Sequence, residues 1–417
     1  MTIKTLCVAC ISTAAMGAAQ AQLQPLTLEE AVRIGESQSP RVEAQHFAVA
    51  SAREQVARAA ELPDPKLRFG IENLPVSGAD RYRYDRDFMT SRAIGLSQEL
   101  TSGAKRAARE SRAARTRDVE QAMLSSQRAM LRRDIAAAWM DVHFAERSRA
   151  EFEGLVRELA AQVEASPAGV ARGAQPLGEA FGARMALAQA REKAVELERL
   201  VQRARIALAA LLPGDAQRPL APSPDTATVH ESRDALLSRL HQHPHLRVYD
   251  VREDLARAEI ELARAGKKPD WSVELGYGQR RPAFDNMVTV MLAVDLPWQA
   301  EKRQDRDVAS RLADAERARA EREEARRVHE AEMRGWLADF DAAAERMQRI
   351  RSTVLPLAQD RIEAALAAYR GGRGELAQVL EARRGAADAR LSLIAVEAER
   401  ARAWASLTYL YPHEAGR

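Results

Sequence analysis

Cysteine is almost absent from this chain of 417 residues, which contains only Cys7 and Cys10. Both lie in a segment with the features of a secretory signal peptide: Lys4, then small and apolar residues, then Ala19-Gln20-Ala21, which has the small-x-small pattern of a cleavage site. Cleavage after residue 21 would remove both cysteines and leave a mature chain that starts near Gln22. We therefore expect no disulfide, no thiol catalysis and no cysteine-containing metal site.

A lipoprotein signal is the alternative interpretation of this segment, because Cys10 follows Val8 and Ala9. Position 7 is cysteine rather than leucine, however, and so early a cut would leave almost no apolar core. We therefore prefer ordinary cleavage of residues 1–21 over attachment of lipid to Cys10.

Aromatic residues and an excess of charge of one sign are also lacking. Aromatics make up 5% of the chain, and 63 lysines and arginines stand against 60 aspartates and glutamates, a net charge of +3. Basic residues alternate with acidic ones, as on a solvated helix surface, so we expect no nucleic-acid partner. After the signal peptide no apolar run approaches the roughly 20 residues of a membrane-spanning helix. Without a nucleophile elbow, phosphate-binding glycine loop or HExxH motif, the sequence predicts neither an enzyme nor a cofactor.

Proline and glycine are rare in two long segments rich in alanine and charged residues, 104–165 and 300–369. Each has about 60–70 residues and corresponds to about 90–105 Å of α-helix. Their apolar residues recur at steps of three and four, which favours coiled-coil packing. We expect the first helix to end before Pro167 and the second to bend at Pro356, which removes one backbone hydrogen bond.

The chain consists of two similar halves, residues 22–212 and 231–417, joined by a proline-rich linker over 213–230. Each half is predicted to contain a helix, two extended segments, a very long helix, a glycine turn and a last helix, over 177–212 or 375–410. The halves match at one constant offset, which indicates a tandem duplication. The matching residues are Gly173, Leu177 and Arg184 in the first half and Gly372, Leu376 and Arg383 in the second.

The extended segments, 66–77, 88–99, 271–280 and 286–297, alternate apolar with polar or small residues. A period of two predicts β-strands with one apolar face, and about 9–12 residues can cross a bilayer as a tilted strand. Trp271 opens one strand and Trp298 closes the next, so a hairpin places both at one end, as in an interfacial aromatic belt. Alternation alone does not separate this interpretation from soluble hairpins that cap a helical bundle.

The number of strands and the helix lengths favour the membrane interpretation. Four strands cannot close a barrel, and open strand edges are not tolerated in lipid, so several copies would have to pool their strands. The shorter helices of each half add up to about 88 and 90 Å, nearly the length of their long neighbour. Such a balance is what a tube wall of antiparallel helices requires.

Several motifs, taken in order, resemble the TolC family of outer-membrane efflux ducts over essentially the whole mature chain. They are Leu26-Thr27-Leu28-Glu29-Glu30-Ala31-Val32, Leu62-Pro63-Asp64-Pro65, Gly95-Leu96-Ser97-Gln98-Glu99-Leu100 before Lys105-Arg106, Lys268-Pro269-Asp270-Trp271, and Tyr369-Arg370-Gly371-Gly372-Arg373-Gly374 before Val379-Leu380-Glu381-Ala382. Within the family, Asn73-Leu74-Pro75 and Arg86-Asp87-Phe88-Met89-Thr90 look most like members that serve heavy-metal efflux pumps of the cobalt–zinc–cadmium or copper–silver type.

The resemblance implies a mainly α-helical protein with a small membrane β-barrel. Three copies would form a homotrimer with twelve strands in the Gram-negative outer membrane and a helical tube through the periplasm. The implied partners are a periplasmic adaptor, a proton-driven inner-membrane RND pump and outer-membrane lipid. The implied function is a passive exit duct for heavy-metal cations.

Two other functions compete with this interpretation. One is a duct of the same family for drug efflux or type I protein secretion. The other, less well supported, is a periplasmic coiled-coil adaptor, which would need a lipoyl-like β-domain of about 80 residues that the sequence lacks. The sequence does not identify the exported substrate.

The resemblance assigns two functions to the closed end of the helical tube. Adaptor docking falls on the glycine turns, whose need for positive φ would by itself explain the glycines. A periplasmic gate falls beside them, with Tyr369 facing the carboxylate of Glu179, and with Gln378 and Glu381 at the positions of two ring acids. Because Gln378 is not an acid, the attraction of the constriction for cations stays open. The docking residues are Arg172, Gly173, Arg370, Gly371, Gly372 and Arg373.

One histidine cluster, His241, His243 and His245, resembles a set of metal ligands. Pro244 interrupts the cluster and no cysteine lies near it. A solvated loop at the start of a helix is therefore favoured over a metal site.

Overall fold

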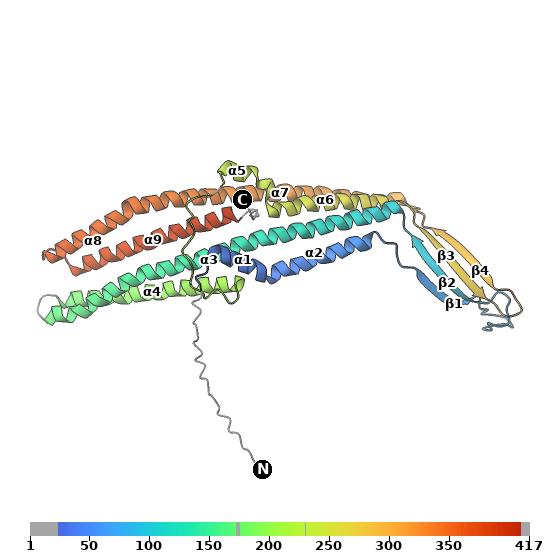
Figure 1. The fold of residues 1–417 in the computed structure, drawn as a ribbon, viewed down its shortest axis with the longest axis horizontal. Helices are drawn as coiled ribbons and strands as arrows, with labels where there is room; N and C mark the ends of the chain where they lie inside the picture. Colours follow the sequence, from blue (N-terminus) through green and yellow to red (C-terminus); the bar gives the residue numbers. More distant parts are fainter. Residues whose placement is uncertain (1–23, 172–175, 230, 410–417) are drawn as a thin grey trace, which may run out of the picture.

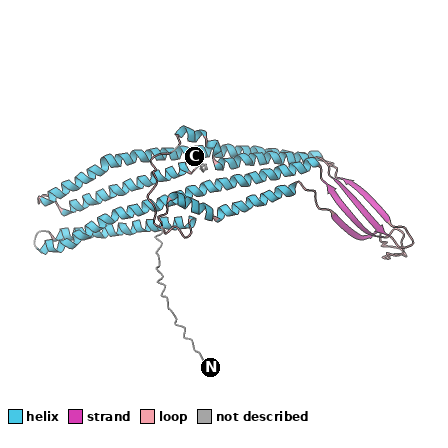
Figure 2. Ribbon diagram, in the orientation of Figure 1, coloured by secondary structure: helices cyan, strands magenta, loops and turns pink. Residues whose placement is uncertain are grey.

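A long helical body with a β-sheet at one end makes up the molecule (Figures 1 and 2). The computed structural model describes residues 24–171, 176–229 and 231–409. The signal peptide with Cys7 and Cys10, and the tip residues Arg172 and Gly173, lie outside these ranges. The mainly helical architecture with one four-stranded sheet in the described residues confirms the fold class predicted from the sequence.

The two halves contain the same order of main elements, each with short helices added. The first half has α1 (Leu28–Gln38), α2 (Pro40–Ala59), β1 (Lys66–Glu72), β2 (Ser91–Leu100), α3 (Gly103–Ala171) and α4 (Leu177–Leu211). The second half has α5 (Arg233–Ser238), η1 (Leu240–Gln242), α6 (Pro244–Ala265), β3 (Trp271–Gln279), β4 (Met287–Val294), η2 (Ala300–Lys302), α7 (Gln304–Arg349), η3 (Ile350–Val354), α8 (Leu355–Arg370) and α9 (Leu376–Thr408).

Short polar side chains cap the first turn of several of these helices. Thr27 caps α1 by accepting a hydrogen bond from the Glu30 N–H at 3.1 Å. Ser39 caps α2 in the same way, directly before Pro40, which needs no hydrogen-bond partner at a first helical position. Ser39 and Pro40 therefore separate α1 from α2. The start of α2 at Pro40 was predicted, whereas the separate helix α1 was not.

The helix lengths of the two halves balance closely. α2 and α4 have 20 and 35 residues, α6 and α9 have 22 and 33, so each pair totals 55. α3 has 69 residues, and α7, η3 and α8 together run without a break for 67. α3 packs against α2, α4, α6 and α9, so one long helix contacts both halves.

Both long helices contain a proline, and the first one differs from the prediction. α3 does not stop before Pro167 but continues through it to Ala171, with the proline ring exposed to solvent. Pro356 is the second residue of α8, which continues without a break from η3, a π-helical turn. Such a turn shifts the backbone hydrogen bonds by one residue, so the missing N–H of Pro356 does not end the helix.

The strands are shorter than the segments that the alternation predicted. β1 ends at Glu72 because Asn73 has a φ of 56° and Pro75 cannot donate to a ladder. The Thr90 hydroxyl donates to the Asn73 carbonyl at 2.9 Å and closes the base of the loop, so β2 starts only at Ser91. β4 likewise ends at Val294, three residues before Pro297.

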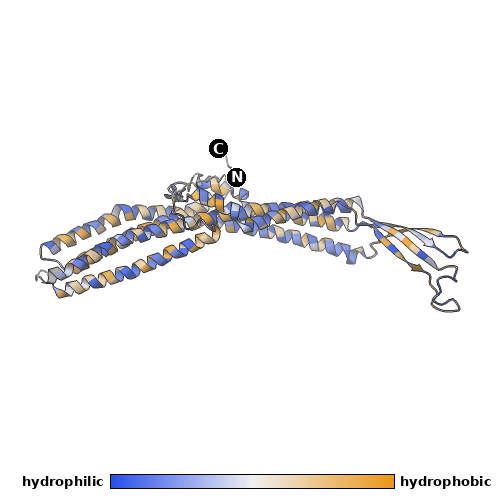
Figure 3. Ribbon diagram, turned by 60° about the horizontal axis from the view of Figure 1, so that its bottom comes forward, coloured by the Kyte–Doolittle hydropathy of each residue, from blue (hydrophilic) through white to orange (hydrophobic). Residues whose placement is uncertain are grey.

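The sheet has the order β1-β2-β3-β4, with every neighbouring pair antiparallel. β2 and β3 join the two halves, and β1 and β4 are its outer edges. Its elongated helical neighbours mix hydrophilic and hydrophobic residues along their whole length (Figure 3). Among the described residues, no helix combines the length and the apolar character needed to cross a membrane.

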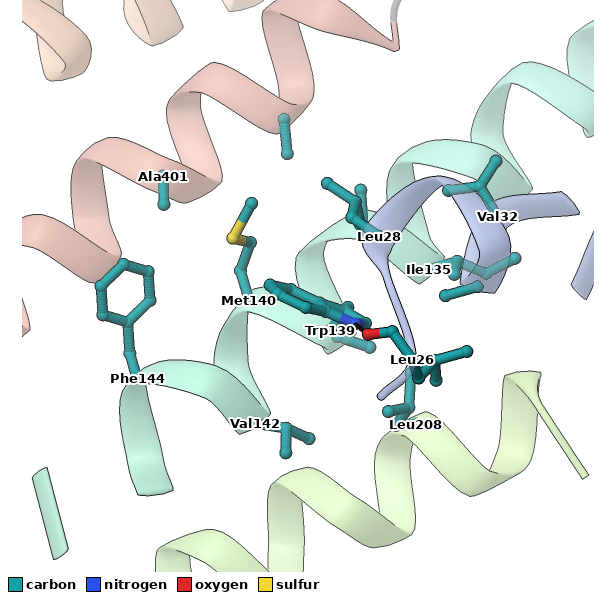
Figure 4. Close-up of a cluster of buried hydrophobic side chains, with 14 of the residues drawn as sticks. Leu26, Leu28, Val32, Ile135, Trp139, Met140, Val142, Phe144, Leu208 and Ala401 are labelled. Carbon is teal, nitrogen blue, oxygen red and sulfur yellow. Dashed lines mark hydrogen bonds between the residues drawn. The ribbon is translucent and has the colours of Figure 1, made fainter. Parts of the chain in front are cut away.

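The largest apolar core lies midway along the body, around Trp139 of α3 (Figure 4). The indole N–H of Trp139 donates to the Leu26 carbonyl at 3.1 Å, and the Ala221 N–H donates to the same oxygen. The chain start and the proline-rich linker are thereby fixed side by side against α3, with Leu26 paired to Leu220. The linker is thus part of the core and not a free connection.

Candidate functional site

The register of the sheet gives it one apolar and one polar face. Across the four strands, the apolar face carries Leu67, Phe69, Ile94, Leu96, Leu275, Tyr277, Val288, Val290 and Leu292. The large apolar side chains on it are exposed, Phe69 at 80%. An apolar face of this size that stays exposed among the described residues indicates a surface covered by lipid or by another molecule.

The opposite face carries small and charged residues. Arg68 of β1 pairs with Glu274 of β3, and the pair crosses over β2 at Gly95. A Cβ at Gly95 would lie 3.1 Å from a carboxylate oxygen of Glu274. Glycine therefore leaves the room that this cross-strand ion pair needs, which is a physical reason for the glycine in the Gly95–Leu100 motif.

Trp271 and Trp298 lie at the end of the sheet that adjoins the helices. Trp271 is the first residue of β3 and pairs with Val294, the last residue of β4. Trp298 follows β4 and is 87% exposed. The hairpin thus brings both indoles to one end of the sheet.

The junction between sheet and helices is held by contacts that the sequence analysis did not single out. Lys105 Nζ donates to Asp270 Oδ2 at 2.5 Å, and the Ser102 N–H donates to the other carboxylate oxygen at 3.3 Å. Burial works to raise the pKa of Asp270, but the hydrogen bonds from Lys105 and Ser102 outweigh it and hold this pKa below its usual value. On the same junction Gln98 donates to the Pro63 carbonyl at 2.8 Å.

Four of these residues, Pro63, Gln98, Lys105 and Asp270, belong to three of the motifs by which the chain resembles the TolC family. Their contacts connect β2 and the start of α3 to the segments that precede β1 and β3. Gln98 and Pro63 are 35 residues apart and Lys105 and Asp270 are 165 residues apart, so local sequence patterns could not predict these contacts.

At the opposite end of the body, α8 and α9 are joined by a tight turn over residues 371–375. Gly372 has a φ of +69°, which L-residues with a Cβ rarely adopt. The Gly371 and Gly372 N–H groups donate to Ala367 and Tyr369 carbonyls, both at 3.0 Å. Arg370 and Arg373 are exposed on either side of this turn.

The predicted gate residues lie beside this turn but form no single cluster. Tyr369 of α8 and Glu179 of α4 lie near each other, and burial, followed by the charge of Glu179, raises the pKa of the tyrosine hydroxyl. No hydrogen bond joins the two in the described structure; Glu179 Oε2 is buried without a partner there. Gln378 is exposed, and Glu381 is bound by Arg361 of α8 at 2.8 Å.

A groove of about 850 Å³ runs between α3, α4 and α9 next to these residues. Its floor is apolar, with Phe152, Leu155 and Leu159, and its walls carry charged residues that include Glu179, Glu381 and Arg384. The ion pair between Glu381 and Arg361 was not predicted from the sequence, because Arg361 lies on the neighbouring helix, 20 positions away.

The histidine cluster differs from the solvated loop that the sequence favoured. His243 is buried and caps α6, its Nδ1 accepting from the His245 N–H at 3.1 Å. His245 Nδ1 lies 2.6 Å from His329 Nε2 of α7, while His241 turns away to the Ser238 carbonyl. In the part of the chain that the structure describes, no three His, Cys, Asp or Glu residues are arranged to hold a metal ion.

Burial lowers the pKa of His243 to about 3, with further contributions from His329, His245 and Arg133. The pKa of His245 is lowered for the same first reason. Both rings are therefore neutral in the folded protein at neutral pH. The contact with His329, 84 residues from His245, gives the cluster a structural role that the local sequence did not reveal.

Comparison with known proteins finds the family model described as outer membrane efflux protein, which matches residues 35–214 and 236–411. The cobalt-zinc-cadmium resistance protein CzcC of Cupriavidus metallidurans is 25% identical over 396 residues, covering 89% of this chain and 86% of that protein. Among solved structures, CusC superposes with a TM-score of 0.79 at 16% identity, covering 94% and 93% of the two chains. The Campylobacter jejuni CmeC outer membrane channel gives 0.77 at 12% identity, covering 93% and 87%.

Proposed function

This chain belongs to the outer membrane efflux protein family, and we propose that it is the passive exit duct of a tripartite system that exports heavy-metal cations. The observation that carries the duct proposal is the sheet: one continuous apolar face, one polar face and two open edges. A duct needs such a wall, because lipid must meet apolar side chains while the lumen must stay wet.

The open edges support assembly from several copies. β1 and β4 each expose an unpaired row of backbone groups, and both strands are exposed on both faces in the single chain. In lipid these groups need partners, so β4 of one copy would pair with β1 of the next. Three copies would close a barrel of twelve strands, and the equal helix sums of the two halves would continue it as a tube. The duct itself would perform no chemistry.

The test of the duct is the state of the mature protein in the cell. We expect it in the outer-membrane fraction as a trimer that dissociates on heating in detergent. A soluble monomer in the periplasm would contradict the duct and would favour the adaptor interpretation.

The cargo proposal is supported by the relative named for cobalt, zinc and cadmium resistance and by the loop motifs that look like those of metal-efflux members. Deletion of the gene should increase sensitivity to a panel of divalent and monovalent soft metal cations and leave sensitivity to drugs unchanged. Sensitivity to drugs alone, or loss of a secreted protein, would favour the other ducts of the family.

The turn between α8 and α9 is proposed to dock the periplasmic adaptor, which in turn would connect the duct to an inner-membrane RND pump. The exposed Arg370 and Arg373 offer it two guanidinium groups next to an apolar groove. A double charge reversal, Arg370→Glu with Arg373→Glu, should abolish co-purification of the adaptor while the trimer persists. Equal recovery of the adaptor with the unchanged protein and with the double variant would contradict docking at this turn.

The residues beside the turn are proposed to close the duct at its periplasmic end. Glu179 and Tyr369 come from helices of different halves, and the charge of Glu179 acts on the tyrosine hydroxyl, so a hydrogen bond between them in the closed duct would connect the two helix pairs. Tyr369→Phe with Glu179→Gln should raise the conductance of the purified duct in planar bilayers. Arg361→Gln would free Glu381 and should raise cation selectivity without the same rise in conductance.

A further inference from the structure

The end of the sheet far from the helices carries six arginines. They lie in the loop between β1 and β2, at the start of β2, and in the turn between β3 and β4: Arg81, Arg83, Arg86, Arg92, Arg280 and Arg281. Four aspartates share these segments, so the charge is +2 for each copy. We call these six residues the arginine rim.

No residue of the rim forms a salt bridge within 4 Å anywhere in the described structure. The helices behave differently. Arg326 contacts Glu323 and Glu330, and Arg311 contacts acids on its own helix and on α6. The aspartates of the rim segments are not placed to neutralise it: Asp87, for example, accepts from the Met89 N–H at 2.6 Å.

The structure holds several of these arginines in position through aromatic rings and backbone carbonyls. Arg281 lies over the ring of Phe284 at 4.6 Å and donates to the Asp85 carbonyl at 3.4 Å, which connects the two loops. Arg92 lies over Tyr84 at 5.0 Å. A cavity of about 490 Å³ lies between these side chains, and the buried Arg281 Nε has no hydrogen-bond partner among the described residues.

The position of Arg92 relates the rim to the apolar face. Arg92 pairs with Ile71 on one side and with Gln279 on the other, in line with Ile94 and Leu96 along β2. It is therefore the residue at which the exposed apolar face ends and charge begins. At such a boundary a membrane protein meets the headgroups of the lipid.

We propose that the arginine rim binds the phosphate groups of a phosphate-bearing glycolipid in the outer leaflet of the membrane. The fork of a guanidinium matches two phosphate oxygens, and guanidinium groups without acidic partners need not break an ion pair to bind them. The inference rests on the proposed placement of the sheet in the outer membrane. It adds a lipid partner of defined chemistry to the duct.

The test uses the purified full-length trimer in phosphatidylcholine vesicles that contain either a bisphosphorylated glycolipid or the same glycolipid without phosphates. Bound lipid is counted by native mass spectrometry after extraction. In the test variant, Arg83→Gln, Arg86→Gln and Arg92→Gln are combined, because none of these side chains has a hydrogen bond in the described structure. The control combines Arg317→Gln, Arg319→Gln and Arg327→Gln, which removes the same charge from exposed positions of α7.

We expect the test variant to bind the phosphorylated glycolipid roughly a hundredfold more weakly, at about fivefold for each arginine near an anionic surface. The control should bind like the unchanged protein, and the corresponding triple lysine variant should retain most of the affinity, which shows that the loops still fold. None of these four proteins should retain the glycolipid without phosphates.

Equal binding by test variant and control, or equal binding of both glycolipids, would overturn the proposal while leaving the duct intact. Displacement of the glycolipid by millimolar inorganic phosphate would also overturn it, because the rim would then be a site for free phosphate. A trimer that enters no vesicle of any composition would remove the membrane placement itself and the proposal with it.

Discussion

The sheet and the helical body handle the same kinds of residue in opposite ways. In the body, Trp139 is fully buried at 0% exposure and arginines pair with acids along and between helices. In the sheet, Phe69 and Val290 are 80% and 67% exposed, and the arginines at its far end have no acidic partner in the described structure. The body therefore encloses its main core within one chain, although apolar side chains such as Phe47 and Ile206 stay exposed on it, whereas the apolar face of the sheet is exposed on all four strands.

The difference teaches where the stability of each part comes from. Burial of apolar side chains within the chain stabilises the body by about 25 cal/mol for each Å² removed from water. The sheet gains little from this source in the single chain, because the large side chains of its apolar face are exposed. In the proposed duct, lipid and neighbouring copies would cover this face.

The largest loss of stability in the body is expected at Trp139. Trp139→Ala would leave a cavity in the core and remove the donor to the Leu26 carbonyl, which we expect to cost about 3–5 kcal/mol of unfolding free energy. Urea unfolding followed by near-UV circular dichroism measures this loss. Phe69→Ala on the sheet is the comparison, and a loss as large as that of Trp139→Ala before membrane insertion would break the contrast between the two regions.

The two faces of β4 can be compared at neighbouring positions. Val290→Arg places a charge on the apolar face and should destabilise the inserted protein by about 2–4 kcal/mol. Met291→Arg lies on the polar face, directly across from Glu274, and should change stability little. The amount of heat-dissociable trimer in the outer membrane reports both. If the two variants assembled equally well, the apolar face would not be facing lipid.

The histidine cluster of the body predicts a dependence of stability on pH. The folded pKa of His243 is about 3, below the value of about 6.5 for an unfolded histidine. Its contribution is therefore fully present above pH 6.5 and is lost as the pH falls toward 3, by up to about 1.4 kcal/mol for each pH unit.

His243→Asn keeps an acceptor for the α6 cap and should flatten this part of the pH profile. The urea midpoint, measured between neutral pH and about pH 5, is the readout. His241→Asn, two residues earlier and exposed, is the control and should leave the slope as it is. A slope that is the same in all three proteins would show that His243 is not the group responsible.

The smallest effect is expected at the turn that ends the body. Gly372→Ala would force a φ of +69° on a residue with a Cβ, at a cost of about 1–2 kcal/mol. Gly178→Ala, in open space on α4, should instead stabilise by up to about 1 kcal/mol. Hydrogen exchange of the α8 and α9 amides should become faster in Gly372→Ala and stay unchanged in Gly178→Ala. Unchanged exchange in Gly372→Ala would show that the turn is not under the stated constraint.

Local pattern predicted the parts of this fold that depend on near neighbours. Strands β3 and β4 were predicted by the strict alternation of apolar with polar or small residues. The long helices were predicted by apolar residues at continuous steps of three and four, and the turn at Gly372 by its glycines. The resemblance to the TolC family, carried by short motifs, is confirmed by the family match over both halves. The docking and gate assignments stay predictions.

The sequence by itself determined the fold class, the duplication and the two faces of the sheet, because side-chain alternation and helical period act over a few residues. Only the tertiary structure decided the passage of α3 through Pro167, the π-helical turn before Pro356 and the burial of His243 against His329. It also decided the junction in which Lys105 meets Asp270, and the absence of acidic partners around the described arginines of the rim. These depend on residues tens to hundreds of positions apart, whose approach is set by packing and not by local preference.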